Sequence, residues 1–230
     1  MVVLVLVVLV LAAGVAAVLV GDQVVRDRVE SAVAVRLQPE LGTPEPPTVD
    51  VGESPFVPQV VAGEIDSVRV RADGVGTTTQ QPLTVRHLDL TFRQVRSADR
   101  FATATAGSAE GRADLDLSAL SALLGSDVVY AGNGRVSFTT MTTVLGSSLQ
   151  VEVTGRPQLD IGPQTVTLAD AQARVDDLQL PDSATEVLMR RLVQPVPISG
   201  IPLGLQVTSI AIDEGGVHLG LAGQDIPLAR

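Results

Sequence analysis

The chain has no cysteine and no tryptophan, and only four phenylalanines and one tyrosine in 230 residues. The absence of cysteine excludes disulfide bonds, thiolate chemistry, zinc–thiolate sites and a lipidated N-terminal cysteine. Because aromatic side chains are so scarce, the core has to consist of valine, leucine, isoleucine and alanine. Such aliphatic strands suit a packed core or a cavity for acyl chains, and composition alone does not separate the two.

The chain also lacks an excess of positive charge, since its formal net charge is −10 at pH 7. Nucleic-acid binding requires a basic surface, so we expect no nucleic-acid partner. A polybasic attachment to anionic lipid surfaces is excluded for the same reason.

Residues that carry catalysis are few. The two histidines are His87, at a change of strand phase, and His218, on the polar face of a strand where we expect it to be solvated. No G-x-S-x-G nucleophile motif occurs. Alternation places Asp114 and Asp116 on the solvent side of a strand, and the glycines at 132–134 indicate a hairpin turn. We therefore predict a non-enzymatic protein without catalytic residues, metal site or cofactor.

Residues 2–20 are entirely without charge. As a helix rising 1.5 Å per residue they would reach roughly 28 Å, close to the hydrocarbon thickness of about 30 Å. A signal peptide would carry a basic start, which is missing, although alanines at positions 12–17 could host cleavage. We favour an uncleaved membrane anchor over a cleaved signal, and both place the rest of the chain outside the cytoplasm.

Residues 21–47 are expected to form an amphipathic helix and a proline-rich connector. The apolar face of the helix comprises Val25, Val29, Ala32, Val33 and Leu37. Prolines from Pro39 to Pro47 should end the helix and extend the chain.

Residues 48–230 read mostly as strands and should form one α+β domain. Apolar alternation changes phase at Arg86–His87 and between Val207 and Ile210, which predicts bulges or bends. Asn133–Gly134 marks a hairpin, and Pro157 and Pro163 should separate short strands. Residues 120–124 predict a short helix ending at Gly125.

The clearest helix of this domain is predicted for residues 181–194, which open on a capping box and close before Pro195. No strand–helix alternation runs long enough for a parallel sheet. We therefore expect a mostly antiparallel, strongly twisted sheet that curls around a helix or an apolar cavity.

The stretch Gly52–Val75, GESPFVPQVVAGEIDSVRVRADGV, combines an apolar patch with a half-buried strand that should end at Asp73–Gly74. It contains G-x-x-P-F-x-x-Q-x-x-x-G followed by alternating valines and A-D-G-V. Near the C-terminus stands Ile201–Leu228, IPLGLQVTSIAIDEGGVHLGLAGQDIPL. Together the two stretches resemble the actinobacterial LmeA-like family of envelope phospholipid-binding proteins.

This resemblance implies a fold like that of the tubular lipid-binding proteins and a role in envelope lipid or lipoglycan maintenance. The partners would be a phospholipid and the membrane, on the outer side of the cytoplasmic membrane. The residues that suit the lip or lining of a lipid cavity come from Gly52–Val75 and from the helix predicted for residues 181–194. They are Phe56, Val57, Val60, Val61, Val187, Leu188, Met189 and Leu192. For each of these residues, ordinary core packing is the competing interpretation.

Three functions stay open at this point. The first is non-enzymatic binding of a glycerophospholipid in an apolar cavity. The second is a structural envelope protein with a filled core, and the third is a hydrolase or transferase acting on lipid-linked material.

Overall fold

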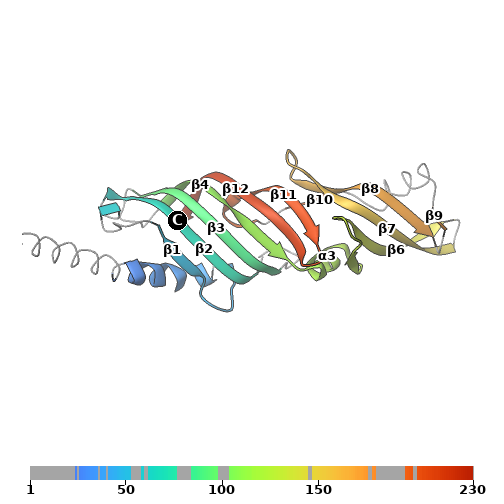
Figure 1. Ribbon diagram of the computed structural model, residues 1–230, viewed down its shortest axis with the longest axis horizontal. Helices are drawn as coiled ribbons and strands as arrows, with labels where there is room; N and C mark the ends of the chain where they lie inside the picture. The colour runs from blue at the N-terminus through green and yellow to red at the C-terminus, as the bar shows by residue number, and fades with distance from the viewer. Residues whose placement is uncertain are drawn as a thin grey trace, which may run out of the picture.

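The computed structural model describes residues 24, 26–35, 37–39, 41–52, 58–59, 62–76, 84–97, 104–144, 147–175, 178–179, 195–198 and 201–229. In this part of the chain two antiparallel sheets follow one another along an elongated molecule (Figure 1). The mostly antiparallel, strand-rich α+β fold is thus confirmed, whereas the expectation of a single sheet is wrong.

The first sheet has the strand order β1-β2-β3-β4-β12-β11. Its strands are β1 (Thr48–Val51), β2 (Glu64–Gly76), β3 (Thr84–Arg96), β4 (Ala104–Leu115), β11 (Gln206–Asp213) and β12 (Gly216–Ala229). Strands β1 to β4 come first in the chain, and the strands of the second sheet follow. The short 3₁₀ helix η1 (Pro202–Gly204) then leads back to the first sheet, where β12 pairs with β4 and β11 pairs with β12.

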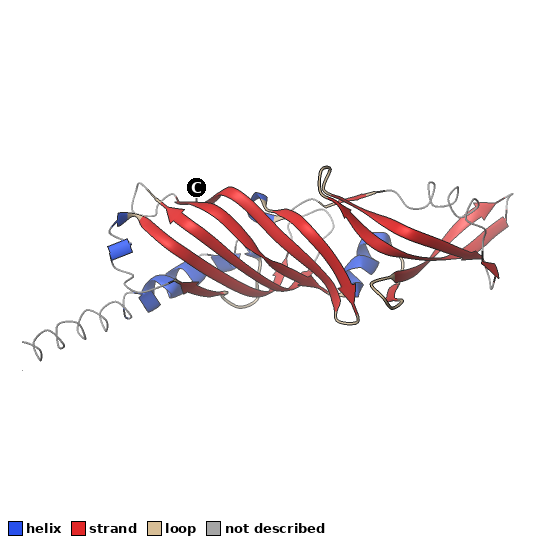
Figure 2. Ribbon diagram, turned by 45° about the horizontal axis from the view of Figure 1, so that its top comes forward, coloured by secondary structure: helices blue, strands red, loops and turns tan. Residues whose placement is uncertain are grey.

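The second sheet has the order β10-β8-β7-β6-β5, with β9 also paired to β8. Its strands are β5 (Val128–Tyr130), β6 (Val136–Val144), β7 (Ser147–Asp160), β8 (Thr165–Val175), β9 (Leu178–Gln179) and β10 (Val196–Pro197). The helix α3 (Leu117–Leu124) connects β4 to β5 and lies where the two sheets meet (Figure 2).

The first sheet curls into half a barrel because its strands contain bulges. The register of β3 against β4 shifts between Val85 and His87, and that of β11 against β12 shifts between Val207 and Ser209. Both shifts fall where the apolar alternation changes phase, so the predicted bends are confirmed. A bulge bends its strand and increases the local twist, which an open sheet needs in order to curl.

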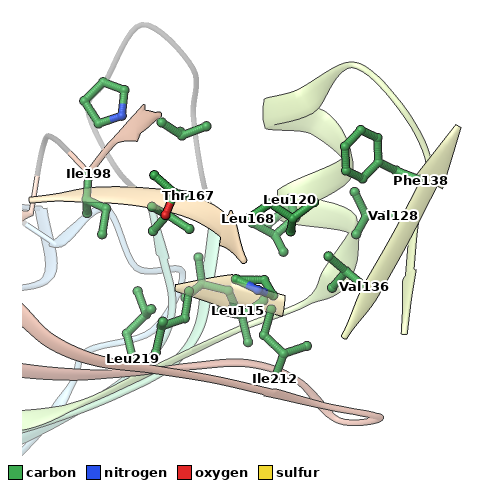
Figure 3. Close-up of a pocket in the computed structure, with 17 residues that line it drawn as sticks. Leu115, Leu120, Val128, Val136, Phe138, Thr167, Leu168, Ile198, Ile212 and Leu219 are labelled. Carbon is green, nitrogen blue, oxygen red and sulfur yellow. The ribbon is translucent and has the colours of Figure 1, made fainter. Parts of the chain in front are cut away.

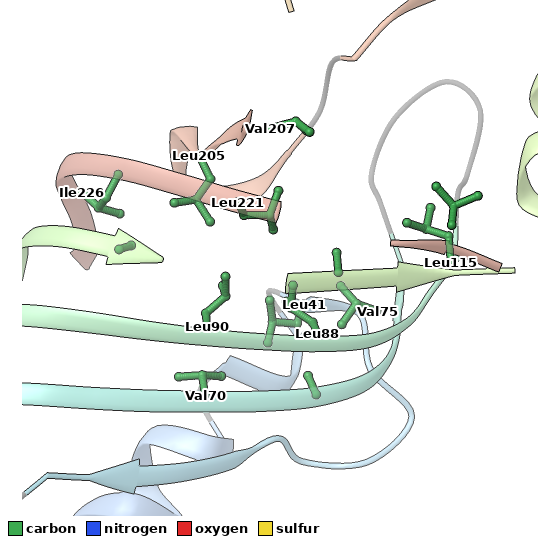
Figure 4. Packing of buried hydrophobic residues seen from close by; sticks show 14 of the residues in the cluster. Leu41, Val70, Val75, Leu88, Leu90, Leu115, Leu205, Val207, Leu221 and Ile226 are labelled. Carbon is green, nitrogen blue, oxygen red and sulfur yellow. The ribbon is translucent and has the colours of Figure 1, made fainter. Parts of the chain in front are cut away.

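The concave face of this sheet carries the main core. Leu88, Leu90 and Phe92 of β3 are almost completely buried, and Leu41 belongs to the same cluster (Figure 4). Leu41 ends the helical part of residues 24–41, which lies alongside the sheet (Figures 1 and 2).

This N-terminal helix is confirmed, but its end and its buried face differ from the prediction. It continues past Pro39 to Leu41, because Gly42 adopts a left-handed φ of 60° and the Thr43 N–H caps the Gln38 carbonyl at 3.2 Å. Val29, Val33 and Leu37 pack against the core as predicted, whereas Ala32 is exposed and Ala34 is buried in its place.

Two strands run through residues that were expected to end them. β2 continues through Asp73–Gly74, where Gly74 takes a φ of 65° within the strand. β7 continues through Pro157, which pairs with Leu168 of β8. The pairing of β6 with β7 reaches only to Gly155, so Pro157 has a neighbour on one side and its missing N–H costs no bond to β6.

The remaining local predictions are confirmed where the structure describes them. The hairpin at Asn133–Gly134 joins β5 to β6, and α3 ends at Gly125 with a left-handed φ of 62°. The helix predicted for residues 181–194 lies outside the described residues.

Gly111 is required by the close approach of β3 to the middle of β4. It pairs with Leu90 on one side and Leu221 on the other. A Cβ placed there would stand 2.1 Å from the Asp89 carbonyl oxygen and 2.7 Å from Leu90 Cδ2. The curl of the sheet therefore leaves no space for a side chain at this point.

We predict that Gly111→Ala lowers the free energy of unfolding by about 1–3 kcal/mol, the usual cost of forcing extra atoms into a packed core. Chemical denaturation of both proteins measures the difference. Glu110→Ala, an exposed neighbour, is the control and should change the free energy by less than about 0.5 kcal/mol. Equal effects of the two substitutions would contradict the tight approach of β3.

Candidate functional site

An apolar cavity lies between the two sheets, next to α3 (Figure 3). Its volume is about 170 Å³. β11 and β12 line one side, β8 and β10 line the other, and α3 with β5 and β6 lines a third. The lining residues are Leu115, Ala119, Leu120, Val128, Val136, Phe138, Pro157, Val166, Thr167, Leu168, Val196, Pro197, Ile198, Ile210, Ile212, Val217 and Leu219.

The alternation of the strands explains why the cavity is apolar. Val217 and Leu219 of β12 face the cavity, whereas His218 between them lies on the opposite face of the sheet. Ile212 of β11 and Leu115 of β4 complete this wall (Figure 3).

Ser121 fixes α3 at the side of the cavity. Its hydroxyl accepts the Val128 N–H at 2.9 Å and donates to the Leu117 carbonyl at 3.2 Å. The side chains of Ala119 and Leu120 line the cavity from this helix. The helix thus closes this side of the cavity together with β5 and β6.

Gln164, in the turn between β7 and β8, joins the two sheets. Its side-chain oxygen accepts the Val207 N–H at 2.9 Å, and its side-chain nitrogen donates to the Val207 carbonyl at 3.1 Å. Its own carbonyl accepts the Ile198 N–H at 2.8 Å. Gln164 therefore satisfies the Val207 backbone groups that a neighbouring strand would otherwise pair. It also binds the backbone of Ile198, directly after β10.

The chemistry available inside the cavity is limited to apolar contact. Thr167 is the polar residue of the lining, and its hydroxyl donates to the Gln158 carbonyl at 3.5 Å. No lining residue among those described is titratable. This wall can remove an apolar ligand from water, and it carries no group for proton transfer.

The outer face of the same wall carries His218 between two carboxylates. Its Nδ1 lies 2.7 Å from Asp114 Oδ1, and its Nε2 lies 3.0 Å from Asp213 Oδ1. These hydrogen bonds, that of Asp114 first, raise the pKa of the His218 imidazole above its ordinary value. In turn His218 lowers the pKa of Asp213, whose Oδ1 also accepts the Gly215 N–H at 2.7 Å.

His218 lies on the polar face of β12 as predicted, but it is not surrounded by water alone, because its register places it beside Asp114 of β4. His87 does sit at the predicted bulge, with Nδ1 2.7 Å from Asp73 Oδ1. Both nitrogens of His218 are occupied by carboxylates, so neither is left to activate a nucleophile.

The other candidates for chemistry form ion pairs on the surface. Asp116 accepts Arg86 Nη1 at 3.1 Å, and Arg69 Nε donates to Asp89 at 2.8 Å. The Arg69 guanidinium lowers the pKa of Asp89. Across the residues that the structure describes, no group of three or more acidic or histidine side chains could hold a metal ion.

The lip and lining residues predicted from sequence all lie outside the described residues, so their role stays a prediction. They are Phe56, Val57, Val60, Val61, Val187, Leu188, Met189 and Leu192. No helix within the described ranges is long and apolar enough to cross a membrane. The proposed anchor at residues 2–20 is not among those ranges.

Sequence reasoning missed the cavity that the described residues form. Its lining appeared as ordinary apolar alternation, for example at Val217 and Leu219, because the sequence does not show that two sheets face each other. No sequence pattern indicates that the Gln164 side chain bonds to the backbone of Val207.

We predict that protonated His218 stabilises the fold, which makes stability depend on pH. The pKa of His218 is higher in the folded state than in the unfolded state, where it is about 6.5. The stability that His218 contributes is therefore complete below pH 6.5 and is lost as the pH rises through the folded-state pKa. At low pH, the stability that Asp213 contributes is lost as its carboxylate becomes protonated. The difference in Tm between the native chain and His218→Gln should be largest near pH 6 and should shrink toward about pH 9.

Thermal unfolding across this pH range checks the prediction. Asp213→Asn removes one of the two carboxylates and should shift the pH dependence to lower pH. A difference in Tm that stays constant over the whole pH range would contradict stabilisation by protonated His218 between Asp114 and Asp213.

Comparison with known proteins bears on what this cavity binds. A search of curated proteins and a search of solved structures gave no match. A family model described as LmeA-like phospholipid-binding matches residues 20–222. This match covers most of the chain; it includes Gly52–Val75 and the second stretch as far as Ala222. The chain therefore belongs to the LmeA-like phospholipid-binding family.

Proposed function

We propose that this protein binds a glycerophospholipid without chemical change and places part of an acyl chain in the cavity between the two sheets. The carrying observation is a cavity lining of sixteen apolar residues and one threonine in a chain of a phospholipid-binding family. Such a lining is typical of sites that recognise a ligand by removing it from water.

The driving force is desolvation of the acyl chain, at roughly 0.8 kcal/mol per buried CH₂ group. An apolar cavity of about 150 Å³ is large enough to bind benzene. With about 170 Å³, this cavity takes a segment of one acyl chain. The glycerol and head group then stay outside the described lining, which gives weak selection among head groups.

The N-terminal sequence and the resemblance support a proposed place of action outside the cytoplasm. Residues 2–20 would hold the chain in the cytoplasmic membrane or direct its export, with the sheets on the outer side. There the protein would carry or present lipid and support maintenance of envelope lipids or lipoglycans. The uncharged run at residues 2–20 supports this placement.

A hydrolase or transferase receives no support from the described residues. The cavity lining contains no nucleophile beside a base, and His218 faces away from the cavity with both nitrogens bound to carboxylates. A purely structural protein with a filled core is less well supported, because the junction of the sheets contains open volume.

We predict that phospholipid copurifies with the full-length protein at close to one molecule per chain. Native mass spectrometry followed by lipid extraction measures the ratio. Ala119→Phe should reduce the ratio several-fold, since the phenyl ring enters the cavity from α3. Ala211→Phe, the same change on the exposed outer face of β11, is the control and should leave the ratio unchanged.

Lipid-free native protein would contradict phospholipid binding itself. Full lipid occupancy in a folded Ala119→Phe protein would contradict this cavity as the binding place.

A further inference from the structure

The outer face of the first sheet carries a polar groove of about 470 Å³, within the usual range of sites for small molecules. The groove crosses β2, β3, β4, β12 and β11, which lie side by side in this order (Figure 1). Leu90 and Phe92 of β3 are buried in the core, so alternation turns Thr91 and Arg93 to the opposite face, where they line the groove. The groove and the apolar cavity share no lining residue.

Two arginines lie at opposite ends of this groove. Thr91 pairs with Glu110, and Glu110 pairs with Ala222, so these residues form one row across the sheet, with short side chains on both sides of Glu110. Arg93 follows Thr91 on the same face of β3, and Arg112 follows Glu110 on the same face of β4. Because β3 and β4 are antiparallel, the two arginines lie on opposite sides of the row.

These two arginines are the cations of the first sheet that have no acidic partner. Arg69, which also lines the groove, donates its Nε to Asp89 at 2.8 Å. The other arginines of the sheet that form ion pairs are Arg71, Arg86 and Arg96. Within the part of the chain that the structure describes, Arg93 and Arg112 form neither an ion pair nor a side-chain hydrogen bond. Two unpaired positive charges therefore meet in one groove of a chain whose net charge is −10.

The bulge of β11 adds a hydroxyl to the groove. Thr208 lies at the register shift between Val207 and Ser209 and has no partner on β12, and a bulge of this kind re-aims a side chain. A Cβ placed at Gly220 would stand 3.1 Å from Thr208 Oγ1 and 2.4 Å from Ser209 Oγ, so both hydroxyls lie over this glycine. Thr208 thus reaches across β12 and lines the groove.

The polar groups of the groove select a ligand that both accepts and donates hydrogen bonds. Guanidinium groups donate in a planar fork that matches the oxygens of a phosphate, and the threonine hydroxyls can donate as well. Glu110, exposed and in the central row, accepts hydrogen bonds only. A phosphate ion without donors would be repelled by Glu110, whereas hydroxyl groups beside the phosphate would satisfy it.

We propose that this groove binds a phosphate ester that carries free hydroxyl groups, such as a glycerol phosphate or a sugar phosphate. Arg93 and Arg112 donate to the phosphate oxygens, and Glu110 accepts a hydrogen bond from a ligand hydroxyl. The apolar cavity lies on the inner face of the sheet, so ligands of the two sites do not compete. The inference therefore does not rest on lipid binding in the cavity.

The test is a titration of the full-length protein in a non-ionic detergent with glycerol phosphate, followed by line broadening in phosphorus NMR. Because exposed charge pairs are individually weak, we expect a dissociation constant of about 1 mM that rises with salt. Arg93→Gln and Arg112→Gln should each raise this constant about fivefold or more. Thermal unfolding shows that each variant is folded.

Arg174→Gln is the matched control, because it removes the same charge from an exposed arginine of β8, outside the groove. It should leave the dissociation constant unchanged. Ala119→Phe, which changes the apolar cavity, should also leave it unchanged.

Glu110→Gln tests the selection against a bare anion. Inorganic phosphate should bind the native chain more weakly than glycerol phosphate does. In Glu110→Gln the repulsion is absent, so inorganic phosphate should bind about threefold more tightly than it binds the native chain. Glycerol without phosphate should not bind measurably.

A soluble lipid, dihexanoyl phosphatidylglycerol, distinguishes the two sources of such an ester. If it displaces glycerol phosphate, the groove accepts the ester as a lipid head group, and if it does not, the groove takes a water-soluble ester. A native chain that does not broaden the glycerol phosphate signal would overturn the proposal. Equal loss of binding in Arg174→Gln and Arg112→Gln would do so too, as would a preference over inorganic phosphate that persists unchanged in Glu110→Gln.

Discussion

The junction of the two sheets depends on one side-chain amide, that of Gln164. The edge of β11 would otherwise leave a backbone N–H and a carbonyl at Val207 without partners beside a buried side chain, and unpaired groups of this kind are costly. Gln164 satisfies both groups and at the same time belongs to the turn that starts β8. The contact holds β8 and β10 opposite β11 and β12, and the cavity exists between these strands.

The outer face of the first sheet complements this junction with polar pairs between neighbouring strands. Asp73 meets His87, and His218 meets Asp114 and Asp213. Asp114, Asp213 and His218 lie behind the strands whose inner side chains form a cavity wall. The wall is therefore fixed by interactions that stay in contact with water, and its apolar inner surface needs no polar group of its own. A site built in this way suits binding by desolvation and is poor in the groups that catalysis requires.

The cavity at the junction is the place where we propose that part of an acyl chain binds. It depends on the shortage of charged and aromatic side chains, because aliphatic residues leave volume between the sheets.

The sequence by itself determined the strand-rich class, both strand bulges, the hairpin at Asn133–Gly134 and the short helix that ends at Gly125, because periodicity and turn residues act locally. It also carried the family, since the matched region includes Gly52–Val75 and most of Ile201–Leu228. Only the tertiary structure decided that there are two sheets, that β7 runs through Pro157, and that Gln164 and His218 connect distant strands. Those features depend on which strands become neighbours, and alternation within one strand contains no information about its neighbours.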